Sequence, residues 1–150
     1  MGAIADYFAA EHRDCDEVFA AAEEAAQAGD PAGCRARFQQ FQVAMEDHFR
    51  KEEEILFPAF EAASGIVMGP TRVMRLEHRQ MRETLAEMSD ALAGDDLEEF
   101  LGQAETLLIL MQQHNIKEEQ MLYPMCDRAL GDAVGTVLDA VRNLPADRAA

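Results

Sequence analysis

The chain has 150 residues, 49% of them apolar, which is enough to bury the core of one domain. Its formal net charge of −16 at pH 7 argues against a nucleic-acid partner and against an anionic membrane surface. No apolar run approaches the length of a membrane span, and the first ten residues, MGAIADYFAA, lack the basic region of a signal peptide.

The order of helix formers and helix breakers predicts an all-α chain. Ala, Leu, Met, Glu and Gln are abundant, and no stretch alternates in the manner of a strand. Breaks at Gly29-Asp30-Pro31, Ser64–Pro70, Gly94–Asp96 and Leu130–Asp132 leave helices over about 3–28, 31–63, 71–93 and 96–130, followed by a short helix near 133–143. Connections this short join antiparallel neighbours, so we expect an up-down-up-down antiparallel four-helix bundle with a short C-terminal helix.

Two segments of the chain are nearly the same. HFRKEEEILFP (48–58) and HNIKEEQMLYP (114–124) agree at six of eleven positions, and their numbering differs by a constant offset (114 − 48 = 66). The same offset places EHRDCDEVFA (11–20) on EHRQMRETLA (77–86). We therefore predict a single domain over 1–150, built as a duplicated helical hairpin of about 1–66 and 67–132. The four histidines of the chain, one per long helix, all fall on this repeat: His12, His48, His78 and His114.

The repeated histidines lie on apolar helix faces. His48 and Glu52, like His114 and Glu118, are four residues apart and share a face. The flanking apolar residues make these faces the inward ones: Phe8, Cys15 and Phe19; Phe41, Met45 and Ile55 or Leu56; Met74, Met81 and Leu85; and Leu107, Met111 and Met121 or Leu122. Burying two carboxylates and four imidazoles together without compensation is very costly, and a cation between them removes that cost.

This ligand set suits iron, manganese or zinc, and it is too large for one tetrahedral zinc. Two ions, each held by two histidines with both glutamates bridging, fit it better. A single histidine on an apolar face is more often an ordinary core residue, but four in repeat register favour metal. The neighbouring Glu53 and Glu119 are expected to face solvent. Glu11 and Glu77 are either partners of the histidines or surface charge, and surface charge is favoured.

These residues resemble the hemerythrin-like, or HHE cation-binding, family over nearly the whole chain. The resemblance rests on a histidine in the first helix, His-x-x-x-Glu in the second, Glu-His in the third and His-x-x-x-Glu-Glu in the fourth. It implies a non-haem, oxo- or hydroxo-bridged centre of two iron ions (Fe²⁺/Fe³⁺). It also implies metal ligands His12 and His48 on one iron, His78 and His114 on the other, and Glu52 and Glu118 as bridges.

One position departs from the family pattern. Oxygen-carrying hemerythrins have a further histidine one turn after the third-helix histidine, where this chain has Arg82. The repeat places Asp16 at the corresponding point of the first helix. We expect Asp16 and Arg82 to form an ion pair, with Asp16 as an extra ligand as the alternative. The centre is then expected to be symmetric and more open, which argues against dedicated oxygen transport.

The expected function is that of a di-iron protein that binds or senses oxygen, nitric oxide or iron, rather than a dedicated enzyme. The alternatives are a di-iron enzyme (peroxidase- or catalase-like, or repairing iron centres) and a zinc-binding or metal-free structural bundle. The expected partner is a small diatomic ligand or peroxide, with the chain a monomer or homodimer and its protein partner unknown. Cys15, Cys34 and Cys126 have no pair spacing, so free thiols and a cytoplasmic location are expected. Pro58 and Pro124 are expected to kink or loosen their helices.

Overall fold

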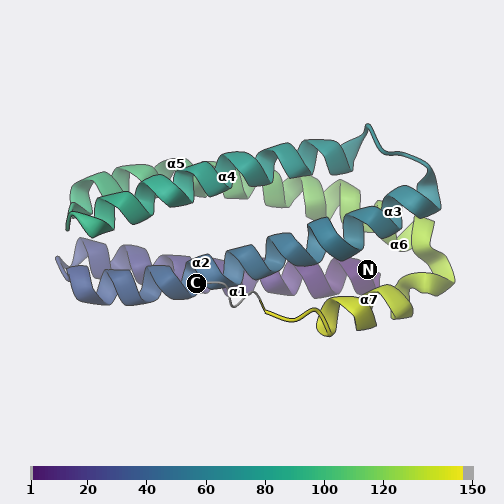
Figure 1. The fold of residues 1–150 in the computed structure, drawn as a ribbon, viewed down its shortest axis with the longest axis horizontal. Helices are drawn as coiled ribbons and strands as arrows, with labels where there is room; N and C mark the ends of the chain where they lie inside the picture. Colours follow the sequence, from purple (N-terminus) through teal and green to yellow (C-terminus); the bar gives the residue numbers. More distant parts are fainter. Residues whose placement is uncertain (1, 147–150) are drawn as a thin grey trace.

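The computed structural model describes residues 2–146, which are almost entirely helical (Figure 1). The helices are α1 (Ala3–Gln27), α2 (Pro31–Arg50), α3 (Phe57–Ser64), α4 (Pro70–Ala93), α5 (Leu97–Lys117), α6 (Tyr123–Leu130) and α7 (Val134–Arg142). Short π-helical segments, η1 (Lys51–Leu56) and η2 (Glu118–Leu122), and one 3₁₀ turn, η3 (Gly131–Ala133), connect them. No strand occurs among residues 2–146, and the predicted all-α bundle is confirmed. Met1 and residues 147–150, part of the predicted domain, lie outside the described residues.

Two long helical hairpins make the bundle. α1 packs along α2, and α4 packs along α5 (Figure 1). The second arm of each hairpin runs on without a break, from α2 through η1 into α3 and from α5 through η2 into α6. These two continuous arms correspond to the predicted helices 31–63 and 96–130. The short helix α7 folds back and contacts α1 and η1.

Each hairpin turns in the same way. The Asp30 carboxylate accepts a hydrogen bond from the Gly33 amide at 3.0 Å, which satisfies a first-turn amide of α2. Asp96 accepts one from the Glu99 amide at 3.0 Å at the start of α5. Asp30 and Asp96 occupy matching positions of the repeat, so the helix starts follow the sequence duplication.

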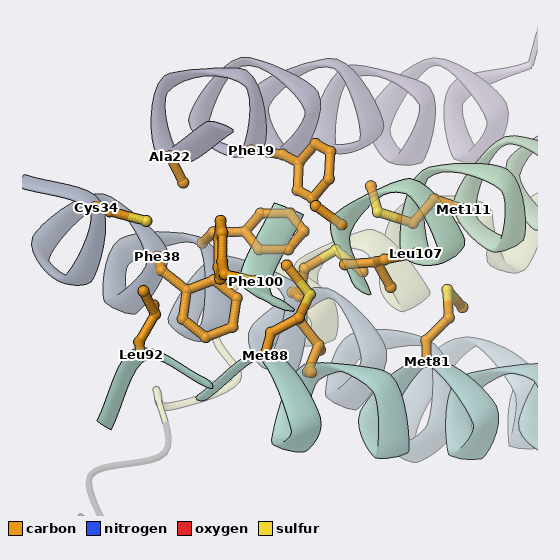
Figure 2. Close-up of a cluster of buried hydrophobic side chains, with 14 of the residues drawn as sticks. Phe19, Ala22, Cys34, Phe38, Met81, Met88, Leu92, Phe100, Leu107 and Met111 are labelled. Carbon is orange, nitrogen blue, oxygen red and sulfur yellow. The ribbon is translucent and has the colours of Figure 1, made fainter. Parts of the chain in front are cut away.

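The core divides into two apolar clusters at opposite ends of the bundle. The Phe100 cluster fills the end where the hairpins turn (Figure 2), with Phe19, Phe38, Phe41, Met88, Phe100 and Leu107 among its members. The Tyr123 cluster fills the end that holds α3, α6 and α7, with Phe8, Leu56, Phe57, Met74, Leu122 and Tyr123 among its members. Met45 and Met111 belong to the Phe100 cluster as core residues. Between the two clusters lies a layer of polar side chains.

The two prolines act through the π segments. Pro58 and Pro124 are the second residues of α3 and α6, just beyond η1 and η2, and they cannot donate a backbone hydrogen bond. Just before them, the Phe57 amide donates to the Glu52 carbonyl, and the Tyr123 amide donates to the Glu118 carbonyl. These bonds span five residues, as in a π turn. The predicted loosening therefore takes the form of a widened turn, and the helix continues beyond it.

Asp127 of α6 ties the first turn of α1 to the bundle. Its carboxylate accepts hydrogen bonds from the Ile4 amide at 2.9 Å and the Ala5 amide at 3.1 Å. First-turn amides lack partners within their own helix, so Asp127→Ala should lower the free energy of unfolding by about 1–2 kcal/mol. Urea denaturation measures this, with Asp139→Ala as the control because the Asp139 side chain is 77% exposed. Equal effects of the two variants would contradict the capping role.

The three cysteines are free thiols, as expected. Cys15, Cys34 and Cys126 are all buried. Burial raises the pKa of the Cys15 thiol to about 11, which keeps it protonated beside His12. Within residues 2–146, no helix combines the length and the apolar character that crossing a membrane requires.

Candidate metal centre

Six polar side chains meet in the layer between the two apolar clusters. One histidine comes from each long helix, and one glutamate comes from each π segment. All six are at most 4% exposed: His12 (α1), His48 (α2), Glu52 (η1), His78 (α4), His114 (α5) and Glu118 (η2). The inward stripes expected from the helical period therefore face one another.

Each of the two carboxylates lies between histidines of different hairpins. Glu118 Oε1 is 3.0 Å from His12 Nε2 and 3.1 Å from His114 Nε2. Glu52 Oε1 is 3.3 Å from His48 Nε2 and 3.1 Å from His78 Nε2. The second arrangement repeats the first in the other half of the duplication. Candidate ligand atoms of two groups converge within 4.8 Å: Glu52, His78, His114 and Glu118; and His12, His48 and Glu118.

Each imidazole forms a hydrogen bond through Nδ1 to a further glutamate at the edge of the layer, called an outer glutamate below. The Nδ1 atoms lie 2.7–2.9 Å from these carboxylates, in the pairs His12–Glu119, His48–Glu11, His78–Glu53 and His114–Glu77. An ionised carboxylate only accepts, so Nδ1 carries the proton and Nε2 turns its lone pair toward the centre of the layer. Metal-binding histidines are oriented in this way.

The outer glutamates correct the expectation for Glu53 and Glu119, and they decide between the two alternatives for Glu11 and Glu77. Glu53 and Glu119 do not simply face solvent, and Glu11 and Glu77 are not free surface charges. A residue next to Glu52 or Glu118 points about 100° round the helix, which here directs it at the neighbouring helix. All four glutamates occupy matching positions of the sequence repeat, and this regularity could have indicated that they contact the histidines.

Buried polar atoms in the layer lack partners. Glu52 Oε1, His78 Nε2, His114 Nε2 and Glu118 Oε2 make no hydrogen bond to any group within residues 2–146. Although some of these atoms lie close together, they are not aligned for hydrogen bonding. Buried polar groups are normally satisfied, so these orphaned atoms fit a cation that accepts their lone pairs.

Protons take the place of that cation in the metal-free chain. Burial opposes charge on His114, but attraction by Glu118 and the hydrogen bond that His114 donates to Glu77 raise its pKa to about 10. The pKa values of His48 and His78 are also raised, because their carboxylate neighbours outweigh burial. Metal binding must therefore displace protons from these imidazoles.

This proton binding predicts how the stability of the metal-free chain depends on pH. A raised histidine pKa contributes stability that is complete below the unfolded value of about 6.5 and is lost as pH rises through the folded value. For His114 that range extends to about 10. The urea midpoint of metal-free protein should therefore fall between about pH 6.5 and pH 10. A zinc-loaded sample is the control, and a rising midpoint in the metal-free protein would contradict the prediction.

Tyr123 is a member of the layer that the sequence analysis missed. Its hydroxyl lies 2.7 Å from Glu52 Oε2, 2.8 Å from Glu118 Oε1 and 3.1 Å from His12 Nε2. Burial and the two carboxylate charges raise its pKa well above the usual range, so it stays a proton donor. Its repeat partner is Phe57, which stacks on His78 instead. The presence of Tyr123 where the other copy of the repeat has Phe57 was the sequence feature that could have pointed to this hydroxyl.

Arg82 does not pair with Asp16 as expected. Its guanidinium donates to both oxygens of Glu46 and both oxygens of Glu53, at 2.8–3.0 Å. Asp16 instead lines a cavity of about 580 Å³ between α1 and α5, together with Glu23 and Glu119. Asp16 is not among the converging candidate ligands of the described chain, so the structure gives no support to it as an extra ligand.

One comparison with known proteins gave a match. A family model described as Hemerythrin HHE cation binding domain matches residues 3–126, which include all six buried polar residues of the layer. Neither the curated proteins nor the solved structures gave a match.

Proposed function

Because the chain belongs to the hemerythrin HHE cation-binding family, we propose that it holds two iron ions and binds or senses oxygen, nitric oxide or iron. The observation that carries the proposal is the pairing of four buried imidazoles with two buried carboxylates that each lie between both hairpins. Imidazole and carboxylate together suit iron, which supplies reversible redox chemistry and small-ligand binding when bound. Zinc and manganese accept the same donors and are the competing metals.

The residues divide into two positions and two bridges. In our assignment His12 and His48 would hold one ion, His78 and His114 would hold the other, and Glu52 and Glu118 would be shared between them. The four outer glutamates fix the imidazole rings and strengthen them as donors. The two apolar clusters on either side keep water away from the centre.

We also propose that the chain is one domain derived from a duplicated hairpin. The support is the constant spacing of the repeat, which recurs in the helix caps, the carboxylate positions and all four outer hydrogen bonds. Such a domain acts on a small diatomic ligand or peroxide, in the cytoplasm, as a monomer or homodimer.

The test is metal analysis joined to an absorption spectrum of the ferrous-loaded protein before and after exposure to air. We expect two irons per chain and new near-ultraviolet bands that change again when nitric oxide is added. A colourless protein that takes up zinc but no iron would overturn the proposal in favour of a structural zinc bundle.

A peroxide-consuming di-iron enzyme is the second candidate, and Tyr123 favours it. Its buried hydroxyl can donate a proton beside both bridging carboxylates, at 2.7 and 2.8 Å. Catalytic peroxide decay by the iron-loaded protein, lost in Tyr123→Phe while two irons remain bound, would support this candidate. Stoichiometric consumption only would support the binding protein.

A further inference from the structure

Two residues at the same place in the repeat carry opposite charges beside the candidate centre. Asp16 and Arg82 differ in number by the offset of the repeat (82 − 16 = 66), and each comes four residues after a histidine of the layer. Their surroundings correspond as well. Asp16 lines a cavity with Glu119, whereas Arg82 lines a cavity of about 400 Å³ with Glu53.

On the Arg82 side, a guanidinium that is shared with Glu46 offsets part of the charge of the outer carboxylate. Arg82 holds Glu53 through two hydrogen bonds at 2.8 and 3.0 Å, and Glu53 in turn holds His78 Nδ1 at 2.7 Å. Arg75 and Arg79 line the same cavity. A carboxylate shared with a guanidinium polarises its imidazole less, and the added positive charge disfavours a divalent cation nearby.

On the Asp16 side, acidic side chains rather than arginines lie near the outer carboxylate. Glu119 holds His12 Nδ1 at 2.7 Å, and no lysine or arginine within residues 2–146 forms an ion pair with it. Asp16 and Glu23 line the cavity beside it, and the pKa of Asp16 is raised by burial and by the charge of Glu119. A cation on this side relieves the repulsion between these carboxylates.

Two lysines occupy matching places in the two halves. Lys51 pairs with Glu11 beside His48, and Lys117 pairs with Glu77 at the matching place beside His114. The Tyr123 hydroxyl reaches both central carboxylates and also lies 3.1 Å from His12 Nε2, so it adds a neutral difference between the halves on top of the charge difference.

We propose that Asp16 and Arg82 make the two metal positions unequal, so that the His12–His48 position fills first and the His78–His114 position fills second with lower affinity. This inference rests on the proposed two-metal function and replaces the symmetric centre expected from the sequence.

Matched single-position variants test the order, with Co²⁺ as the probe in calorimetric titration. His114→Ala keeps the His12–His48 position, and His48→Ala, its counterpart in the repeat, keeps the other. We expect the remaining position in His114→Ala to bind Co²⁺ roughly tenfold more tightly, a difference on the order that unit charges exert on a divalent ion at intermediate dielectric constant. Equal affinities, or the reverse order, would overturn the inference.

Charge variants of the otherwise intact chain keep the test decisive if the alanine variants fold poorly. Asp16→Asn should weaken the first binding step, and Arg82→Gln should tighten the second. Arg79→Gln is the control for Arg82→Gln because Arg79 lines the same cavity but has no ion pair within residues 2–146, so its effect should be smaller. If two binding steps are seen and neither variant shifts them, the inference is overturned and the proposed function stands. If the chain binds neither Co²⁺ nor iron, both the inference and the proposed function are overturned.

Discussion

The double variant Glu52→Gln/Glu118→Gln is expected to fold and to bind no iron, whereas the unchanged chain is expected to bind two ions. Both carboxylates are completely buried, and each lies between histidines of both hairpins. Glutamine preserves their size but removes the two negative charges that offset a cation in a dry interior. Metal analysis after loading and gel filtration measures the content.

Thermal unfolding gives a second, independent result. A metal that binds only the folded chain stabilises it by about 4 kcal/mol per site when free metal is a thousandfold above its dissociation constant. This gain should be absent from the double variant. The control is Glu54→Gln/Glu98→Gln, which removes the same charge from exposed positions. Retention of two irons by the buried double variant would show that the carboxylates are not ligands.

Phe100→Ala should produce a large loss of stability. Phe100 is completely buried and meets Phe38 edge to face, with 5.3 Å between ring centroids (Figure 2). Removal of a buried phenyl ring leaves a cavity and costs about 3–5 kcal/mol. Urea denaturation measures the change in the free energy of unfolding, and Ile109→Ala is the control because Ile109 is 56% exposed.

Metal content should be unchanged in Phe100→Ala, because the Phe100 cluster fills the end of the bundle where the hairpins turn. If the alanine variant is too unstable to purify, Phe100→Leu tests the same packing at a smaller cost of about 1–2 kcal/mol. A loss below about 1 kcal/mol in Phe100→Ala would contradict the packing argument. Parallel loss of metal would show that the two regions are not independent.

The local properties of the chain could be predicted because they depend on neighbours in sequence. Gly29-Asp30-Pro31 and Gly94–Asp96 end and start helices through backbone conformation and capping, and the helices found there agree with the prediction to within a few residues. The helical period places residues four apart on one face, so His48 and Glu52 were expected to point inward together. Both are buried. Their role as metal ligands stays a prediction.

The choice between neighbouring apolar residues required the structure. The sequence left open whether Met121 or Leu122 continues the inward stripe, and Leu122 is buried whereas Met121 is 50% exposed. The same applies to Tyr123. Residues five apart diverge by about 140° on an α-helix but share a face across a π turn, so η2 brings the Tyr123 hydroxyl back toward Glu118.

By itself, the sequence determined the helices, the short turns, the duplicated hairpin pattern and the six polar residues on inward faces, because each follows from helix formers, helix breakers and periodicity along one chain. Only the tertiary structure decided which side chains meet between helices. Glu53 and Glu119 hydrogen-bond to histidines, and Arg82 pairs with Glu46 and Glu53 rather than with Asp16. The physical reason is that long, flexible charged side chains at the edges of a helix can reach several partners. The packing of the neighbouring helices, which no local pattern encodes, selects among them.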